Sequence, residues 1–166
     1  MNLIVAVDEN WGIGKNNGLL FSLKEDMKYF REKTTGNVVC MGYNTLLSFP
    51  DSKPLKNRVN IVLCPEGIER DDLKCVHTLE ELSEALNQYP TEKVFIIGGA
   101  MFYKTMLCHC EYLYITKVRA NGEATVFFEN LDKRSDFVLV SESDVVKDGE
   151  YEITFCTYKN LNVKKF

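Results

Sequence analysis

Short runs of consecutive apolar residues recur along the chain, and polar residues separate them. A run of this kind is typical of a strand that is buried on both faces of a sheet. The runs lie at residues 3–7, 38–41, 59–63 and 94–97. Later segments rich in β-branched and aromatic residues also predict strands, at residues 112–118, 137–140 and 153–158.

Amphipathic segments between the first runs predict helices. Residues 22–25 (Ser-Leu-Lys-Glu) and 78–81 (Thr-Leu-Glu-Glu) have the form of a capping box, in which a hydroxyl and a glutamate satisfy the first N–H groups of a helix. Apolar residues follow each box at helical spacing. A third helix is predicted at residues 99–107, with Phe102 and Met106 on one face.

The alternation of strands and helices predicts an α/β fold. Crossover connections make successive strands parallel and cover both faces of the sheet with helices. The last two strand segments have no long helix between them, and residues 147–150 form a turn signal, so we expect an antiparallel hairpin there. We therefore expect one domain over residues 1–166. It has a central, mostly parallel twisted sheet of about eight strands, a C-terminal antiparallel hairpin and about four flanking helices.

Composition is that of an ordinary globular protein, with 166 residues of which 45% are hydrophobic. The net charge of −4 argues against nucleic-acid binding, which usually needs a basic face. The apolar runs are about seven residues or fewer, whereas a membrane span needs roughly 20. The N-terminus also lacks the basic region of a secretory signal. We expect a cytoplasmic protein without membrane or nucleic-acid partners.

Six cysteines are most simply interpreted as buried thiols in a reducing compartment. Cys108-His109-Cys110 has the residue types of a metal site, but structural zinc usually needs a second pair of ligands and none accompanies this one. The alternative, the end of a helix, is the interpretation that we adopt, and we expect no metal.

In open α/β sheets, ligands bind at the carboxyl ends of the strands. The first strand is followed by a loop with Gly12, Gly14 and Gly18, whose spacing fits neither a dinucleotide fingerprint nor a P-loop. This loop is either a flexible connection or a mobile lid. Gly98-Gly99 follows another strand and precedes a helix, which suits either phosphate binding or close packing.

Two further residues have both a structural and a functional interpretation. Thr45 follows the strand at residues 38–41, where it could donate to a phosphate or cap a helix. Asp26 lies in the first turn of a predicted helix, where a carboxylate commonly faces solvent and interacts with the helix dipole. It could instead lie at the floor of a cleft and bind a protonated or amino-bearing heterocycle.

Together these segments resemble the dihydrofolate reductase family along essentially the whole chain. The matching pieces are residues 4–7, residues 12–15, Phe21 with Asp26 five residues later, residues 39–42 with Thr45, and residues 58–63, 94–99 and 113–116. The resemblance implies reduction of 7,8-dihydrofolate to tetrahydrofolate by hydride transfer from NADPH. The fold is commonly monomeric in this family, so a monomer is expected.

The resemblance also implies residue roles in catalysis and substrate binding. Asp26 matches the acid that binds the pterin 2-amino group and N3 and favours protonation of N5. Thr116 matches the hydroxyl that supports this carboxylate, and Phe21 stands where the family usually has tryptophan. Arg58 matches the partner of the glutamate α-carboxylate. The expected apolar walls are Val5, Ala6, Met27, Phe30, Phe49 and Ile97.

For the cofactor, the resemblance implies that Ala6, Ile13, Gly14 and Leu19 line the nicotinamide end of the cleft. The expected pyrophosphate-binding residues are Gly42, Asn44, Thr45, Gly98, Gly99, Ala100, Met101 and Phe102. The family's adjacent glycines are joined by a cis peptide bond, which is therefore expected between Gly98 and Gly99.

The chain departs from the family pattern in two places. Leu20 and Phe21 replace proline and tryptophan, which puts details of proton delivery in doubt. Tyr43, Cys64 and Met101 stand where residues that bind the 2′-phosphate are common; Glu66 adds a negative charge nearby, and His77 is the one cation we can name. We expect NADPH to be the better cofactor but to be poorly distinguished from NADH, because charge-assisted phosphate bonds are lost.

Two alternatives remain at this stage. One is a reductase of the same fold that acts on a ribosylamino-pyrimidine in riboflavin synthesis, against which Asp26 and Arg58 argue. The other is a non-catalytic nucleotide-binding protein. The segment at residues 161–166 has no function that the sequence assigns.

Overall fold

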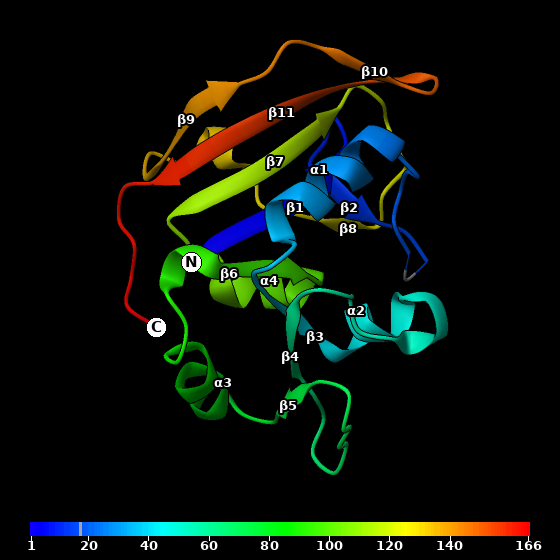
Figure 1. Cartoon of the computed structure of the whole chain (residues 1–166). Helices are drawn as coiled ribbons and strands as arrows, with labels where there is room; N and C mark the ends of the chain where they lie inside the picture. Colours follow the sequence, from blue (N-terminus) through cyan, green and yellow to red (C-terminus); the bar gives the residue numbers. More distant parts are fainter. Residues whose placement is uncertain (17) are drawn as a thin grey trace.

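The computed structural model describes residues 1–16 and 18–166, and its centre is a mixed sheet of nine strands (Figure 1). The strand order is β10-β11-β7-β1-β6-β3-β4-β5, and β9 pairs with β11 as well. The neighbours from β7 to β5 are parallel, and all pairs of β11 are antiparallel. The predicted α/β fold with antiparallel C-terminal strands is therefore confirmed.

The parallel part of the sheet comprises β1 (Asn2–Val7), β3 (Val38–Gly42), β4 (Val59–Leu63), β5 (Lys74–Val76), β6 (Val94–Gly98) and β7 (Tyr112–Val118). The antiparallel strands are β9 (Phe137–Glu142), β10 (Val146–Asp148) and β11 (Tyr151–Asn160). A separate two-stranded sheet joins β2 (Gly12–Gly14) to β8 (Val126–Phe127). The helices are α1 (Lys24–Thr34), α2 (Tyr43–Ser48), α3 (Leu79–Leu86) and α4 (Ala100–Met106).

Alternate residues of the central strands face two different cores, as the period of a strand requires. Leu3, Cys40 and Ile96 belong to a core that also contains the buried residues of α3 and α4. Ile4 and Val39 belong to a second core, against which α1 and α2 pack. Helices on both faces explain why the runs in β1, β3 and β6 are apolar without alternation.

The two predicted capping boxes have different outcomes. At α3, Thr78 Oγ1 accepts a 3.1 Å bond from the Glu81 N–H, so this cap is confirmed. At α1 the prediction is wrong, because the helix begins at Lys24 after Leu23, and no side chain at the N-cap position bonds to it. A carboxylate from β10 takes that place, as described below.

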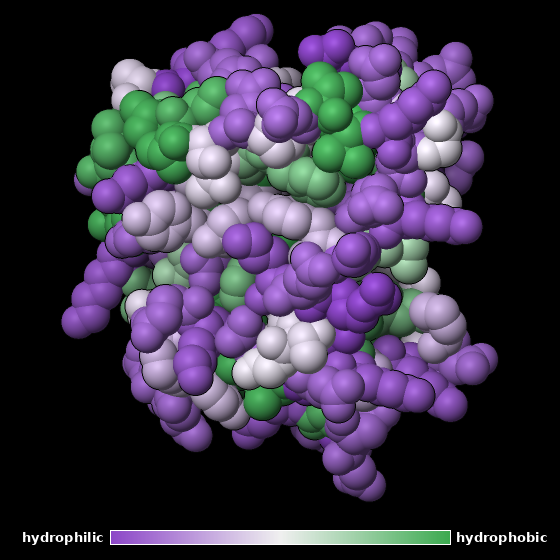
Figure 2. Space-filling model, turned by 45° about the horizontal axis from the view of Figure 1, so that its top comes forward, coloured by the Kyte–Doolittle hydropathy of each residue, from purple (hydrophilic) through white to green (hydrophobic). Residues whose placement is uncertain are grey.

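The C-terminal hairpin turns at Gly149, which has a φ of 62°. Its first arm is β10 rather than the segment at 137–140, which forms β9 and pairs with another part of β11. Residues of β9 are exposed, including Val138, Leu139 and Val140, and Figure 2 shows hydrophobic side chains at the upper left, on the side where β9 lies. The short strands β2, β5, β8 and β10 have too few residues to produce a periodic pattern.

The last residues of the chain dock against the turn after α4. Lys164 N–H donates a 2.9 Å bond to the Cys108 carbonyl, and His109 Nδ1 lies 2.7 Å from the Lys164 carbonyl oxygen. The rings of His109 and Phe166 are 4.9 Å apart. Across residues 1–16 and 18–166, no group of three or more metal-ligating side chains occurs. None of the described helices combines the length and apolar character that crossing a bilayer requires.

Candidate active site

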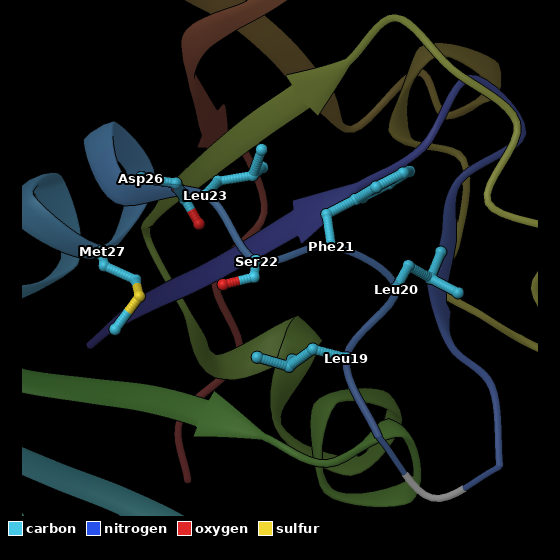
Figure 3. A pocket seen from close by; sticks show the side chains of 7 residues that line it. All are labelled: Leu19, Leu20, Phe21, Ser22, Leu23, Asp26 and Met27. Carbon is cyan, nitrogen blue, oxygen red and sulfur yellow. The ribbon is translucent and has the colours of Figure 1, made fainter. Parts of the chain in front are cut away.

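A hollow of about 370 Å³ lies beside the first turn of α1. Its lining residues are Leu19, Leu20, Phe21, Ser22, Leu23, Asp26 and Met27. Figure 3 shows the side chains of Leu19, Ser22, Asp26 and Met27 around one common space. Leu20 and Phe21 point to the other side of their segment, where a side chain added at Gly122 would meet both of them.

Asp26 is the carboxylate of this hollow. Thr116 on β7, which is itself buried, donates a 2.7 Å hydrogen bond from Oγ1 to Asp26 Oδ1. Burial raises the pKa of Asp26 above its ordinary value; the Thr116 hydrogen bond lowers it, and the negative charge of Asp148 raises it further. A half-hidden carboxylate with a raised proton affinity is typical of a catalytic or ligand-binding group.

The apolar residues predicted to surround the substrate do not all face the same way. Phe30, Phe49 and Ile97 pack in the core on the α1 side of the sheet. Val5 packs in the opposite core, and its neighbour Ile4 lies with Phe30 instead. Sequence alone missed Ile4, although the alternation of side chains along a strand could have identified it.

Met27 and Leu19 expose 60% and 87% of their surface. Neither side chain has a role in a core, so both are available to a ligand in the hollow. Ala6 is half-buried on β1.

Arg58 is held in place by neutral acceptors. Its Nε donates to the Lys56 carbonyl at 2.8 Å, and NH1 donates to Thr34 Oγ1 at 3.2 Å. Burial and the nearby charge of Arg31 lower the pKa of Arg58. Across the described residues, no carboxylate forms an ion pair with either arginine, so the two positive charges are available to an anion. Arg31 was not identified from the sequence.

A glycine corner forms where β3 and β6 end side by side. The Gly98–Gly99 peptide bond is cis, as expected. A Cβ placed on either glycine would lie 3.2 Å from Thr45 Oγ1, and one placed on Gly42 would lie 3.8 Å from Phe102 Cβ. The corner therefore leaves backbone and a hydroxyl accessible where a side chain would fill the space.

The positions expected near a 2′-phosphate carry no free cation among the described residues. His77 Nε2 lies 2.7 Å from Glu69 Oε1, and this carboxylate raises the pKa of His77. Arg70, which was not identified from the sequence, makes a bidentate pair with Asp72 at 2.9 and 2.6 Å and lies within electrostatic range of Tyr43.

Cys64 and Met101, the other two positions expected near the 2′-phosphate, differ in exposure. Cys64 is buried beside Cys75, and burial raises the pKa of its thiol to about 12, so this thiol is not a surface donor. Met101 is 77% exposed at the start of α4.

Part of the predicted glycine lid is anchored. The buried carboxylate of Asp8 accepts hydrogen bonds from the N–H groups of Asn10, Gly12 and Gly122 at 2.9, 2.7 and 3.0 Å. Ile13 and Gly14 lie on β2, which pairs with β8. Position 17, also part of the expected lid, lies outside the described residues.

The mostly parallel sheet, the half-buried carboxylate of Asp26 and the glycine corner at the ends of β3 and β6 are features of an α/β enzyme, in which ligands bind at the carboxyl ends of the strands. The family model for dihydrofolate reductase matches residues 1–160. The chain therefore belongs to the dihydrofolate reductase family, and its reaction is the reduction of dihydrofolate to tetrahydrofolate.

Relatives and solved structures agree with this assignment. The dihydrofolate reductase of Heliothis virescens is 33% identical over 97% of this chain and 97% of its own. That of Bacillus subtilis is 32% identical over 99% of this chain and 97% of its own. The solved dihydrofolate reductase of Enterococcus faecalis, complexed with NADP(H) and RAB-propyl, has a TM-score of 0.84 and 30% identity over 96% of this chain and 95% of its own. These findings set aside the pyrimidine reductase and the non-catalytic protein.

Proposed function

We propose that this chain reduces dihydrofolate with a hydride from NADPH and that Asp26 holds and polarises the pterin. The main evidence is the half-buried carboxylate of Asp26, which a hydrogen bond from Thr116 holds beside an open hollow. Oδ1 accepts the Thr116 hydroxyl, and within the described residues Oδ2 has no hydrogen-bond partner. The carboxylate therefore has acceptor sites left for the 2-amino group and N3 of the pterin.

The negative charge of Asp26 promotes the reaction by favouring a protonated pterin. Hydride reaches C6 of the pterin readily only when N5 is protonated, and a carboxylate in a poorly solvated site favours the protonated pterin. Water delivers the proton through the open side of the hollow, while Phe21 offers no hydrogen-bond donor to hold that water. Reduced nicotinamide, when bound, supplies the hydride.

The rest of the substrate extends along α1. Ala6, Met27, Phe30, Phe49 and Ile97 contact the pterin and benzoyl rings, as does the backbone at Val5. Arg58 binds the glutamate α-carboxylate through its guanidinium group, which Thr34 and the Lys56 carbonyl already orient. Arg31 adds a second positive charge for the remaining carboxylate.

The glycine corner fits the pyrophosphate of a dinucleotide, because a Cβ at Gly98 or Gly99 would fill the space beside Thr45 Oγ1. We assign pyrophosphate binding to Gly42, Asn44, Thr45, Gly98, Gly99, Ala100 and Phe102. Ile13, Gly14, Leu19 and Ala6 line the nicotinamide end.

The adenosine end discriminates NADPH from NADH poorly. Tyr43, Cys64 and Met101 offer no positive charge to a 2′-phosphate, and the cations His77 and Arg70 already pair with carboxylates. NADPH remains the better cofactor in this proposal, which the NADP(H) complex of the Enterococcus faecalis dihydrofolate reductase supports.

The enzyme acts as a monomer in the cytoplasm. All six cysteines are free, which suits a reducing compartment. Size-exclusion chromatography with light scattering tests the monomer, and a stable dimer would contradict it.

The test of the function is a steady-state assay of dihydrofolate reduction, run side by side with NADPH and NADH. Oxidation of NADPH that depends on dihydrofolate is expected, with a modest preference over NADH. Loss of both activities in a folded protein would contradict the proposal. A preference of several orders of magnitude would contradict only the assignment at the adenosine end.

A further inference from the structure

The N-terminus of α1 is capped by a residue from the other end of the chain. Asp148, at the end of β10, is 6% exposed. Its Oδ1 accepts from the Lys24 N–H at 3.1 Å, and its Oδ2 accepts from the N–H groups of Glu25 and Asp26 at 2.8 and 3.4 Å. These are N–H groups that a helix cannot satisfy internally, and no side chain at the helix's own N-cap position bonds to them.

The same hairpin makes a second contact with the segment that leads into α1. Asp148 and Tyr151 face each other across the turn at Gly149. The Tyr151 ring packs edge-on against Phe21 with centroids 4.9 Å apart. Leu23 is buried in the same small cluster as these two rings. The hairpin therefore contacts this segment at Phe21 and again at the first turn of α1. In Figure 1 the hairpin of β10 and β11 lies above α1.

We propose that Asp148 is a positioning residue for the reaction: its carboxylate anchors the first turn of α1 and so fixes Asp26 against Thr116 and the hollow. The inference rests on the proposed function of Asp26. A carboxylate accepts with both oxygens, and the three bonds that it accepts here include one from the N–H of Asp26 itself.

Asp148 also affects the charge of the site. The N-terminus of a helix is positive and favours an ionised Asp26. The negative charge of Asp148 offsets this effect, and it raises the pKa of Asp26. The other titratable groups that interact with Asp26 are Tyr29 on α1 and Tyr103 on α4; burial raises the pKa of both phenols, so they stay neutral near pH 7.

Charged side chains elsewhere on the first turns of α1 belong to Lys24, Glu25 and Lys28, and all of them are exposed. Water screens their effect on Asp26. Among the described residues, Asp148 is thus the buried carboxylate that bonds to this turn from another element.

The experiment compares Asp148→Asn with Glu152→Gln. The second variant removes one carboxylate from the same hairpin, but that carboxylate is exposed and pairs with Arg119. Two readouts are needed: the titration of the Asp26 side-chain carbon by NMR in the ligand-free protein, and the pH profile of hydride transfer. Thermal unfolding reports the loss of the cap, with an expected fall in Tm of about 2–6 °C for Asp148→Asn.

We expect Asp148→Asn to move both midpoints to lower pH and to slow hydride transfer about three- to fivefold on the alkaline side. Glu152→Gln should move neither midpoint. A lower Tm with both midpoints unchanged would overturn the proposal and leave Asp148 as a structural cap. If the NMR midpoint moves but the pH profile of hydride transfer does not, the role in catalysis is overturned, and the failure lies in the function assigned to Asp26.

Discussion

The hydroxyl of Thr116 on β7 donates a 2.7 Å hydrogen bond to Oδ1 of Asp26 on α1, across 90 residues of sequence. The bond stabilises the charged form of Asp26, while burial and the charge of Asp148 favour the neutral form. The pKa of Asp26 is raised because burial outweighs the hydrogen bond. Replacing Thr116 or Asp148 should therefore shift the pKa of Asp26, upward for Thr116 and downward for Asp148.

Replacing Thr116 by valine removes the hydroxyl and keeps the shape of the side chain. Asp26 loses the bond that favours its charged form, so its pKa rises further and the pH profile of hydride transfer moves to higher pH. This shift is opposite to the one expected for Asp148→Asn. An unpaired Asp26 Oδ1 should also cost about 1–3 kcal/mol of unfolding free energy. Thr116→Ser, which keeps the hydroxyl, is the control, and an unchanged profile in Thr116→Val would contradict the prediction.

Asp26→Asn should lower turnover near neutral pH by about 10²- to 10⁴-fold while the protein stays folded. Asn retains an acceptor for Thr116 but brings no charge to the pterin. Single-turnover kinetics with NADPH and dihydrofolate measure the effect. Turnover close to that of the parent would remove Asp26 from the mechanism.

The same variant should be more stable than the parent at neutral pH. The pKa of Asp26 is raised by folding, so between the ordinary and the raised pKa the native state binds more protons than the unfolded state. Stability therefore falls as the pH rises through this window and stays lower above it. Asn avoids that loss, so urea unfolding should show a gain for Asp26→Asn at neutral pH that shrinks in acid. A gain of equal size at every pH would contradict this origin.

Tyr43→Arg should raise the preference for NADPH over NADH about tenfold, because a guanidinium group without a carboxylate partner can bind the 2′-phosphate. The ratio of kcat/KM for the two cofactors measures it. Tyr43→Gln, which is polar but uncharged, is the matched control and should leave the ratio unchanged. The same ratio in Tyr43→Arg and Tyr43→Gln would place the phosphate elsewhere.

Gly12→Ala should destabilise the protein by about 1–3 kcal/mol. A Cβ at this position would overlap that of Ala124 and lie 2.9 Å from Asp8 Oδ1, where β2 pairs with β8. Ala124→Gly removes the first obstacle, so the double variant should recover part of the loss in urea unfolding. Additive losses in the two single variants would show that the two positions do not meet.

Local patterns predicted the features of this fold that depend on neighbouring residues. The cap of α3 was found because Thr78 and Glu81 lie within one helical turn. The cap of α1 was assigned to Ser22, but the groups that satisfy Lys24 and Glu25 belong to Asp148, more than 120 residues away. A capping-box sequence covers four neighbouring residues, so it cannot indicate a carboxylate on a strand far away in the sequence.

In the candidate site, too, some features follow from the sequence and others depend on tertiary packing. Asp26, Thr116 and the Gly98–Gly99 pair follow from motifs in the sequence, because a family resemblance rests on residue types in order. The partners of His77 and Arg70, the burial of Cys64 and the orientation of Val5 away from Phe30 depend on how loops and strands pack.

The sequence by itself determined that the chain forms a mostly parallel α/β sheet with a carboxylate and a glycine pair beyond its strands, because hydrophobic periodicity and turn residues act over short distances. Only the tertiary structure decided the electrostatic setting of Asp26. Thr116 and Asp148 reach it from β7 and β10, and the balance of burial, hydrogen bonding and charge that sets its pKa exists only once these strands lie against α1.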